Sequence, residues 1–362
     1  MVDMGKYRFV TLLDEESIAT AGTKTIDLEG LSPISKIVIA ARATNNGSTP
    51  TAHPSAIVSK IELLDGSDVH ESISGQQSQA IAFYDEGEMP FVCNETEDNV
   101  GCQANFHLNF GRKLWDKNLA YVPARFSNPQ LKITHNKASG GSAPDAGTLG
   151  VYAWVFDNGS VNPSGFLMNK EVKSYAVTAS AHNYTDLPTD YPLRQLFLQN
   201  LYAGTAPTQA IANVTLSENQ SQRVLFNGSR GREMIKAMYG GKMCRDAFGT
   251  LGTGSAVTYY VAPTYENYFT GVGRSASQST LIVGQGSGGT VSVTNDSSEA
   301  VQVIAEGYCP HGMIGVPFGD LSEIADWQDM SGVRKLELDV YASSGASSSS
   351  TTRIMTQQLK HY

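Results

Sequence analysis

The chain has 362 residues, of which 41% are hydrophobic and 17% are charged, and its formal net charge is −9. The hydrophobic fraction suffices for two packed cores and excludes a disordered chain. Because an acidic chain does not attract phosphate backbones through its overall field, we do not expect direct, sequence-specific binding of nucleic acid. The low charge and the many Gly, Ser, Thr and Asn residues favour short strands joined by turns.

The N-terminal segment is not predicted to be an export signal. Residues 1–14 lack an apolar stretch of the needed length before Asp14, Glu15 and Glu16 interrupt it. No run of about 18 apolar residues, the length that spans a membrane, occurs anywhere in the sequence. We therefore expect the protein to be made and kept in the cytoplasm of the producing cell.

The first half of the chain contains a series of landmarks. A proline opens an alternating strand at 33–39, and a second strand follows at 56–63. A segment of helical character at 74–84 comes next, then the pair Phe110-Gly111 with Trp115-Asp116 behind it. A strand at 130–133, a loop of small residues and a final strand at 149–156 complete the half.

The second half repeats these landmarks in the same order. Its counterparts are the strands 192–198 and 210–216, the helical segment 229–239, the pair Phe318-Gly319, and the strands 335–338 and 353–359. The largest change in spacing relative to the first half lies between the helical segment and Phe318, which places an insertion at about 245–305. We predict at least two strands within it, at 257–261 and 290–293.

Two similar halves of roughly eight short strands and one short helix predict an all-β fold. Eight antiparallel strands in two facing sheets make a jelly-roll β-sandwich barrel, so we predict two of them in tandem. The turn dipeptides Asn158-Gly159 and Asn162-Pro163 mark the boundary. The first jelly roll is expected over 1–165 and the second, with the insertion, over 166–362.

Motifs that carry chemistry are missing from the sequence. Its histidines and cysteines show no HExxH, CxxC or comparable metal spacing, and no GxSxG motif marks a nucleophile. We interpret the cysteines as free thiols that are buried or partly buried, with a bridge between Cys93 and Cys102 as the alternative. We predict no catalytic residue, no metal site and no cofactor.

An acidic stretch is the one candidate for a cation site. It comprises Asp85, Glu86, Glu88, Glu95, Glu97 and Asp98. Hard cations such as calcium prefer several oxygen ligands, but the stretch lacks the regular ligand ladder of a calcium loop. We interpret it as a solvated acidic edge.

With these residues in view, the chain resembles the double jelly-roll major capsid proteins of tailless icosahedral viruses, the lineage that includes the adenovirus hexon and many bacterial and archaeal viruses. The segment 61–67 with the following 72–75, the Phe-Gly pairs at 110 and 318, and the strand 335–338 paired with the final strand carry the resemblance. The twofold order of these motifs is more specific than any one of them, and the resemblance covers essentially the whole chain.

The resemblance implies a structural protein of the virion. Three chains would form a pseudo-hexameric capsomer, because two similar barrels per chain give six similar corners. The expected partners are further copies of the chain, neighbouring capsomers, penton and minor capsid or membrane proteins, and an internal lipid membrane where the virus has one. By this analogy the insertion forms an outward tower or an intersubunit contact; the alternative is that it covers its own barrel.

A carbohydrate-binding or glycoside-cleaving β-sandwich is the alternative function, because jelly rolls also serve lectins and glycosidases. Aromatic side chains such as Trp154, Trp327 and Tyr260 could stack on sugar rings, and a pair of carboxylates could cleave a glycoside.

Overall fold

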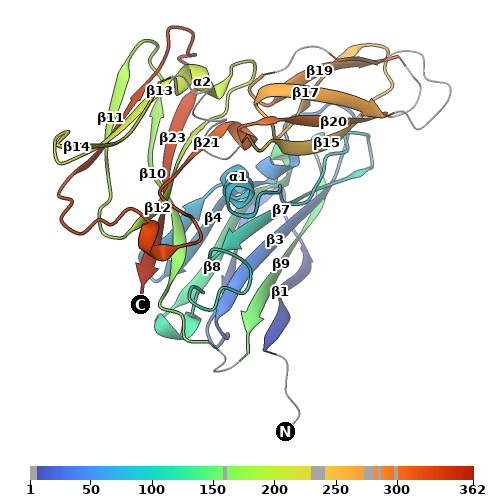
Figure 1. Cartoon of the computed structure of the whole chain (residues 1–362). Coiled ribbons are helices and arrows are strands. Elements are labelled where there is room, and N and C mark those ends of the chain that lie inside the picture. The colour runs from blue at the N-terminus through green and yellow to red at the C-terminus, as the bar shows by residue number, and fades with distance from the viewer. Residues whose placement is uncertain (1–5, 158–160, 230–240, 273–280, 284–286, 297–300) are drawn as a thin grey trace.

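The structure is a computed structural model that describes residues 6–157, 161–229, 241–272, 281–283, 287–296 and 301–362. Two β-barrels lie side by side, and a smaller two-sheet body sits over one end of the first (Figure 1). Within these residues, no helix is long and apolar enough to span a membrane.

The first barrel is built from two facing sheets. One has the strand order β1-β9-β3-β7-β6 and the other contains β2-β8-β4-β5. The strands are β1 (Tyr7–Ser17), β2 (Ala21–Asp27), β3 (Ile34–Thr44), β4 (Val58–Asp65), β5 (Asp68–Ile73), β6 (Val92–Cys93), β7 (Gly101–Asn109), β8 (Pro129–Asn136) and β9 (Ala146–Phe156). In β7 and β8 every second residue is buried, because one face of each strand lines the core.

The second barrel repeats this arrangement. Its sheets have the orders β10-β23-β12-β21 and β11-β22-β13-β14. The strands are β10 (Gly165–Ala176), β11 (His182–Leu187), β12 (Leu193–Asn200), β13 (Asn213–Glu218), β14 (Arg223–Ser229), β21 (Met313–Pro317), β22 (Leu336–Tyr341) and β23 (Thr351–His361). Apart from the two-residue strand β6, both orders match those of the first barrel, which confirms the prediction of two jelly rolls.

The two barrels share one continuous sheet. Strand β5, the edge of its sheet in the first barrel, pairs in parallel with β10 through Ser72 and Lys170. The resulting eight-stranded sheet has the order β2-β8-β4-β5-β10-β23-β12-β21. The core of the first barrel extends across this seam to Phe197 and Met355 of the second barrel, whose own core lies on the other side of its sheet.

Helix α1 (Gly75–Glu86) lies at the centre of the molecule, between the two barrels (Figure 1). Its start is fixed by a capping box in which Ser74 Oγ accepts from Gln77 N–H and Gln77 Oε1 accepts from Ser74 N–H. A side chain at Gly75 would come within 2.6 Å of Phe106 and 2.7 Å of two carbonyl oxygens, so only glycine lets the helix approach β7 this closely. The helix predicted at 74–84 is therefore confirmed.

Shorter helical turns join several of the strands. They are η1 (Pro54–Ile57), η2 (Pro123–Arg125), η3 (Lys137–Ser139), α2 (Pro207–Ala210), η4 (Pro310–Gly312) and η5 (Ile324–Asp326). The second predicted helix, at 229–239, lies almost wholly outside the described residues.

The insertion forms a small sandwich with its own core. Its strands are β15 (Cys244–Thr250), β16 (Ala256–Tyr260), β17 (Tyr265–Val272), β18 (Leu281–Val283), β19 (Thr290–Asn295) and β20 (Val301–Tyr308). They form two sheets, β15-β20-β17 and β16-β19-β18, around a cluster that includes Phe248, Tyr259 and Val303. The strands predicted at 257–261 and 290–293 correspond to β16 and β19.

Candidate functional site: the barrel junction and the open sheet face

The junction between the barrels is a buried polar network rather than an apolar contact. Gln77 on α1 donates from Nε2 to Glu171 at 2.8 Å and to Gln199 at 3.1 Å, both in the second barrel. Tyr84 donates to the carbonyl of Met313 at 2.7 Å. Because these bonds need fixed geometry at both ends, they hold the two barrels in a single relative orientation.

A buried ion pair extends the network at the end of α1. Asp85 accepts from Arg194 of β12, and the two side chains are 3% and 2% exposed. Gln195 and Gln357 also donate to this carboxylate, at 2.8 and 3.0 Å. The guanidinium lies 5.6 Å from the ring centre of Trp327. The charge of Asp85 is thus compensated, as burial requires.

The seam between β5 and β10 holds a second buried carboxyl group. Glu71 accepts from the backbone N–H of Asn169 at 2.9 Å and from its side-chain amide at 2.8 Å. Burial raises the pKa of Glu71 to about 8, and the two bonds from Asn169 offset this only in part. We therefore expect the seam to respond to pH below about 8.

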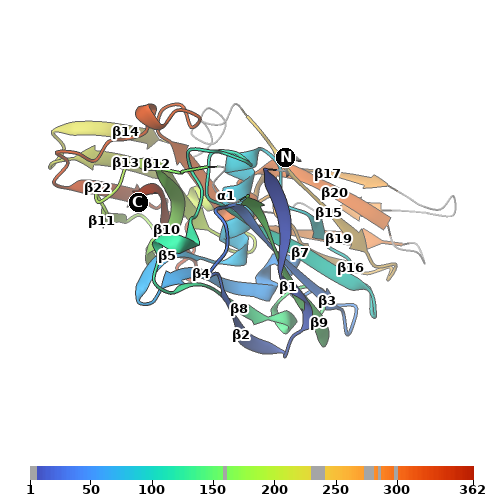
Figure 2. The ribbon, with the colours of Figure 1, turned by 90° about the horizontal axis from the view of Figure 1, so that it is seen from below.

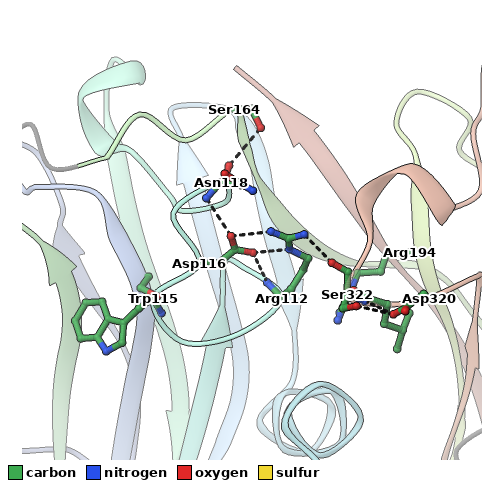
Figure 3. Close-up of polar contacts among 10 residues, drawn as sticks. Arg112, Trp115, Asp116, Asn118, Ser164, Arg194, Asp320 and Ser322 are labelled. Atoms are coloured by element: carbon green, nitrogen blue, oxygen red, sulfur yellow. Dashed lines mark hydrogen bonds and ion pairs between the residues drawn. The ribbon is translucent and has the colours of Figure 1, made fainter.

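Two corner loops meet beside the junction, and Figure 3 shows their contacts. Arg112 donates to both carboxylate oxygens of Asp116, at 2.7 and 3.0 Å, and reaches across to the carbonyl of Ser322 at 2.6 Å. Ser322 in turn is held by Asp320. These loops follow the Phe-Gly pairs of the two halves, so the repeated motif builds an inter-barrel contact.

The insertion is anchored to the first barrel. Asn94, Glu95 and Thr96, which follow β6, bond to Tyr260, Gln302 and Gly249 of the insertion at 2.7–2.9 Å. The prediction that it serves as a tower or intersubunit contact remains a prediction. The alternative, that it covers its own barrel, also remains a prediction, because Tyr265 and Tyr308 of the insertion pack against the core of the second barrel.

Two histidines that are far apart in sequence meet where the insertion is anchored. The rings of His53 and His311 lie 4.9 Å apart, with His53 Nε2 3.1 Å from Asp246 and His311 Nε2 2.8 Å from the side-chain Oε1 of Gln79. Burial, reinforced by His53, lowers the pKa of His311 well below its usual value. This buried cluster ties η4, α1 and β15 together; nothing in the spacing of the histidines signals it.

The outer face of sheet β1-β9-β3-β7 carries an aromatic surface, which we call the open face. It consists of Tyr7 and Phe9 on β1, Tyr152 and Trp154 on β9, and Trp115 from the corner loop. Phe9 is 58% exposed and stacks on Tyr152 at 5.5 Å, with Trp154 edge-on at 4.9 Å. Tyr7 is 42% exposed and lies 4.5 Å from Trp115. A clustered, exposed aromatic surface of this kind is typical of protein interfaces.

The residues that sequence analysis singled out are dispersed. The prediction of a solvated acidic edge is wrong for Asp85, which is buried against Arg194. Glu86 and Glu88 are exposed as expected, and Glu86 also binds Lys36, His107 and Asn109. Burial would raise the pKa of Glu86, but His107 and Lys36 outweigh it and lower the pKa to about 2. Across the described residues, no group of three or more His, Cys, Asp or Glu is placed to hold a metal ion.

The cysteines and the candidate sugar-stacking aromatics lie in different parts of the fold. All four cysteines are free; Cys102, Cys244 and Cys309 are buried and Cys93 is partly exposed, as predicted. Trp327 is buried under Arg194, Trp154 lies on the open face and Tyr260 belongs to the insertion. The three aromatics therefore do not form one sugar-binding platform.

Comparison with known proteins gives structural matches only. No protein-family model and no curated protein sequence matches the chain. VP54 of PBCV-1, which has been fitted into a reconstruction of the virophage Sputnik, is 11% identical at a TM-score of 0.56, covering 98% of this chain and 93% of its own. The STIV MCP is 12% identical at 0.56, covering 99% and 98%. The major capsid protein P2 from bacteriophage PM2 is 8% identical at 0.56, covering 98% of both chains.

These matches span both barrels and the insertion in a single alignment. The chain is a double jelly roll. At 8–12% identity the likeness establishes the fold. The chemistry of the surface must be argued from the residues of this chain. In this double jelly roll, the two features with functional potential are the rigid junction inside the chain and the open face outside it.

Proposed function

We propose that the chain is a viral major capsid protein, a structural and non-catalytic subunit located in the capsid of the virion and made in the host cytoplasm. The observation that carries the proposal is the repetition of one barrel within a chain whose fold, over nearly its full length, is shared with the major capsid protein P2 from bacteriophage PM2. Buried hydrogen bonds hold the two equivalent barrels in one orientation, so the chain would act as a rigid building block, or tile, of the shell.

The proposed assembly follows from the repetition. Three chains would close into a ring of six similar barrels, which packs like a hexamer while using a single gene product. We propose 1–165 and 166–362 as the two units of that tile. The buried network of Gln77, Asp85 and Arg194 supports this role, because a hinged pair of barrels would not give a defined hexagonal outline.

The wider partners also belong to the proposal. Neighbouring capsomers, penton and minor capsid or membrane proteins would contact the trimer, and an internal lipid membrane would lie beneath it in a virus that has one. The net charge of −9 argues against direct, sequence-specific contact with the genome.

Light scattering after size exclusion, together with negative-stain microscopy, tests the proposal. We expect a stable particle of three times 38.8 kDa that appears hexagonal when viewed end-on. An obligate interface of this kind buries more than about 2,000 Å², so the trimer should persist on dilution. A monomer at every concentration, with no hexagonal outline, would overturn the assignment.

A further inference from the structure

We propose that the trimer is held by the open face and the β1 edge of one chain receiving the β14 edge of the next chain. This inference rests on the proposed function and assigns the residues of its interface. It is supported by the junction inside the chain, where the equivalent strand edges of the two barrels already pair.

The internal junction supplies the template. There the β5 edge of the first barrel pairs with the β10 edge of the second, and α1 covers the outer face of sheet β10-β23-β12-β21, which we call the covered face. Strands β1 and β14 are the counterparts of β10 and β5 in the matching sheet orders. In the part of the chain that the structure describes, both stand unpaired at the ends of their sheets.

The register identifies the residue of β1 that corresponds to Lys170, the contact residue of β10. Lys170 lies across β23 from Leu196, since both pair with Thr356. Val10 lies across β9 from Ile37, since both pair with Ala153. Ile37 and Leu196 occupy the same place in the repeated proline-opened strand, so Val10 is the counterpart of Lys170.

The same reasoning on the other edge leads to Val224. Ser72, the contact residue of β5, pairs with Glu62, which pairs with Lys132 of β8. Val224 pairs with Ser217, which pairs with Glu337 of β22. Lys132 and Glu337 follow the equivalent leucines of the repeated strand. The template therefore places Val224 of one chain against Val10 of the next.

The surfaces that the template selects are apolar and exposed in the single chain. Val224 is 50% exposed on one edge, and Phe9, beside Val10, is 58% exposed on the other. Long unpaired edges with apolar side chains are a hazard that folded proteins cover, and a second copy of the chain does so here.

The position of the two edges fits a closed ring. Strand β14 lies at the left end of the molecule in both views, and β1 lies well apart from it on the far side of the first barrel in Figure 1 (Figures 1 and 2). A contact between two different surfaces is head-to-tail, and such contacts close into a ring when the rotation allows it. Two separate edges, joined in this way, give each chain two neighbours.

Three single substitutions on the full chain test the interface. Phe9→Glu and Val224→Glu each place a charge in the proposed contact, and Tyr184→Glu, at a residue that is 59% exposed on β11, is the matched control. We expect the first two to raise the dissociation constant of the trimer by about 100-fold or more, because an unpaired charge would be buried. The control should remain trimeric, and circular dichroism should show that all three fold.

Mixing the two defective variants tests the head-to-tail arrangement. The Phe9→Glu chain retains an unmutated β14 edge, and the Val224→Glu chain retains an unmutated open face. At a concentration where each alone is monomeric, the mixture should yield a one-to-one heterodimer, an outcome that misfolded variants cannot give. Absence of the heterodimer would overturn the arrangement.

The outcomes separate this inference from the proposed function. A wild-type protein that is monomeric at every concentration would contradict both. A wild-type trimer that survives Phe9→Glu and Val224→Glu would overturn the interface and leave the capsid assignment standing. Loss of the trimer with Tyr184→Glu alone would place the interface on the β11 side instead.

Discussion

The outer faces of the two sheets β1-β9-β3-β7 and β10-β23-β12-β21 have the same topology and opposite chemistry. On the covered face, Gln195 and Gln357 are fully buried, and their amides bond to each other and to Asp85. At the equivalent places on the open face stand Lys36, paired with Glu86, and Trp154, packed under Phe9.

The contrast reflects where the partner of each face comes from. The covered face meets α1 of the same chain, which arrives in a fixed position and accepts hydrogen bonds from the buried amides of Gln195 and Gln357 through Asp85. A face that meets a separate molecule gains more from aromatic area, which tolerates small differences in docking. Under the proposed interface, the same strand pattern is adapted once to a permanent internal contact and once to assembly.

The largest effect is expected from breaking the covered face. Arg194→Met leaves the buried Asp85 carboxylate without its counter-charge, so we expect a loss of about 3–5 kcal/mol in the free energy of unfolding. Urea denaturation followed by circular dichroism measures it. The double variant Arg194→Met with Asp85→Asn removes both charges and should recover much of the loss. Equal stability of the single and double variants would contradict the buried-charge explanation.

Glu71 should make stability fall as the pH rises. The unfolded group loses its proton near pH 4.5, whereas the folded group keeps it to about pH 8, so the folded state binds more protons in between. Its contribution is complete below pH 4.5 and is lost by about pH 8, a decline on the order of 5 kcal/mol at most. Denaturation midpoints at several pH values should show the decline in the wild type.

The variant Glu71→Gln should flatten that profile, because a neutral amide does not titrate. Glu29→Gln, at an exposed residue, serves as the control and should follow the wild type. An unchanged slope in Glu71→Gln would show that another group governs the pH dependence of stability.

A pair of equivalent substitutions compares the two faces directly. Asn169 and Phe9 hold the same place on β10 and β1, across from Gln357 and Trp154. Asn169→Ala removes the side-chain bond to buried Glu71 and should cost about 2 kcal/mol. Phe9→Ala, on an exposed ring, should cost about 1 kcal/mol or less when the chain is kept monomeric by dilution. Equal losses of unfolding free energy in the two variants would contradict the difference between the covered face and the open face.

The smallest effect is expected at the start of α1. Ser74→Ala removes the side-chain cap and should lower the unfolding free energy by about 1 kcal/mol, measured by thermal denaturation. Ser59→Ala, which removes a hydroxyl bonded to a backbone carbonyl at an exposed site, should change it by less than about 0.5 kcal/mol. A larger loss for Ser59 would show that the cap does not determine the stability of this region.

The barrels were predictable because their signal is local and occurs twice. Alternation around Ile37 and Leu196, proline at the start of each strand, and the repeated order of landmarks identify the strands without long-range information. The helix at 74–84 could also be predicted from local sequence, since Ser74 and Gln77 have the spacing of the capping box that they form.

The junction was not predictable, because each contact joins residues that are distant in sequence. Asp85 looked like part of a solvated edge, and the arginine that buries it comes 109 residues later. His53 and Asp246, which anchor the insertion, are 193 residues apart. The open face left a partial signal: Tyr152 and Trp154 alternate with Val151 and Ala153, so both faces of β9 are apolar, as in a strand covered on two sides.

The position of β23 sets the order in which the chain can fold. This strand lies between β10 and β12, and Gly165 at the start of β10 pairs with His361. During synthesis, β10 and β12 therefore emerge long before the strand that joins them. Such non-local pairing makes folding slow and leaves strand edges exposed in the meantime. The second barrel should mature last, so a chain that lacks β23 cannot complete the double jelly roll.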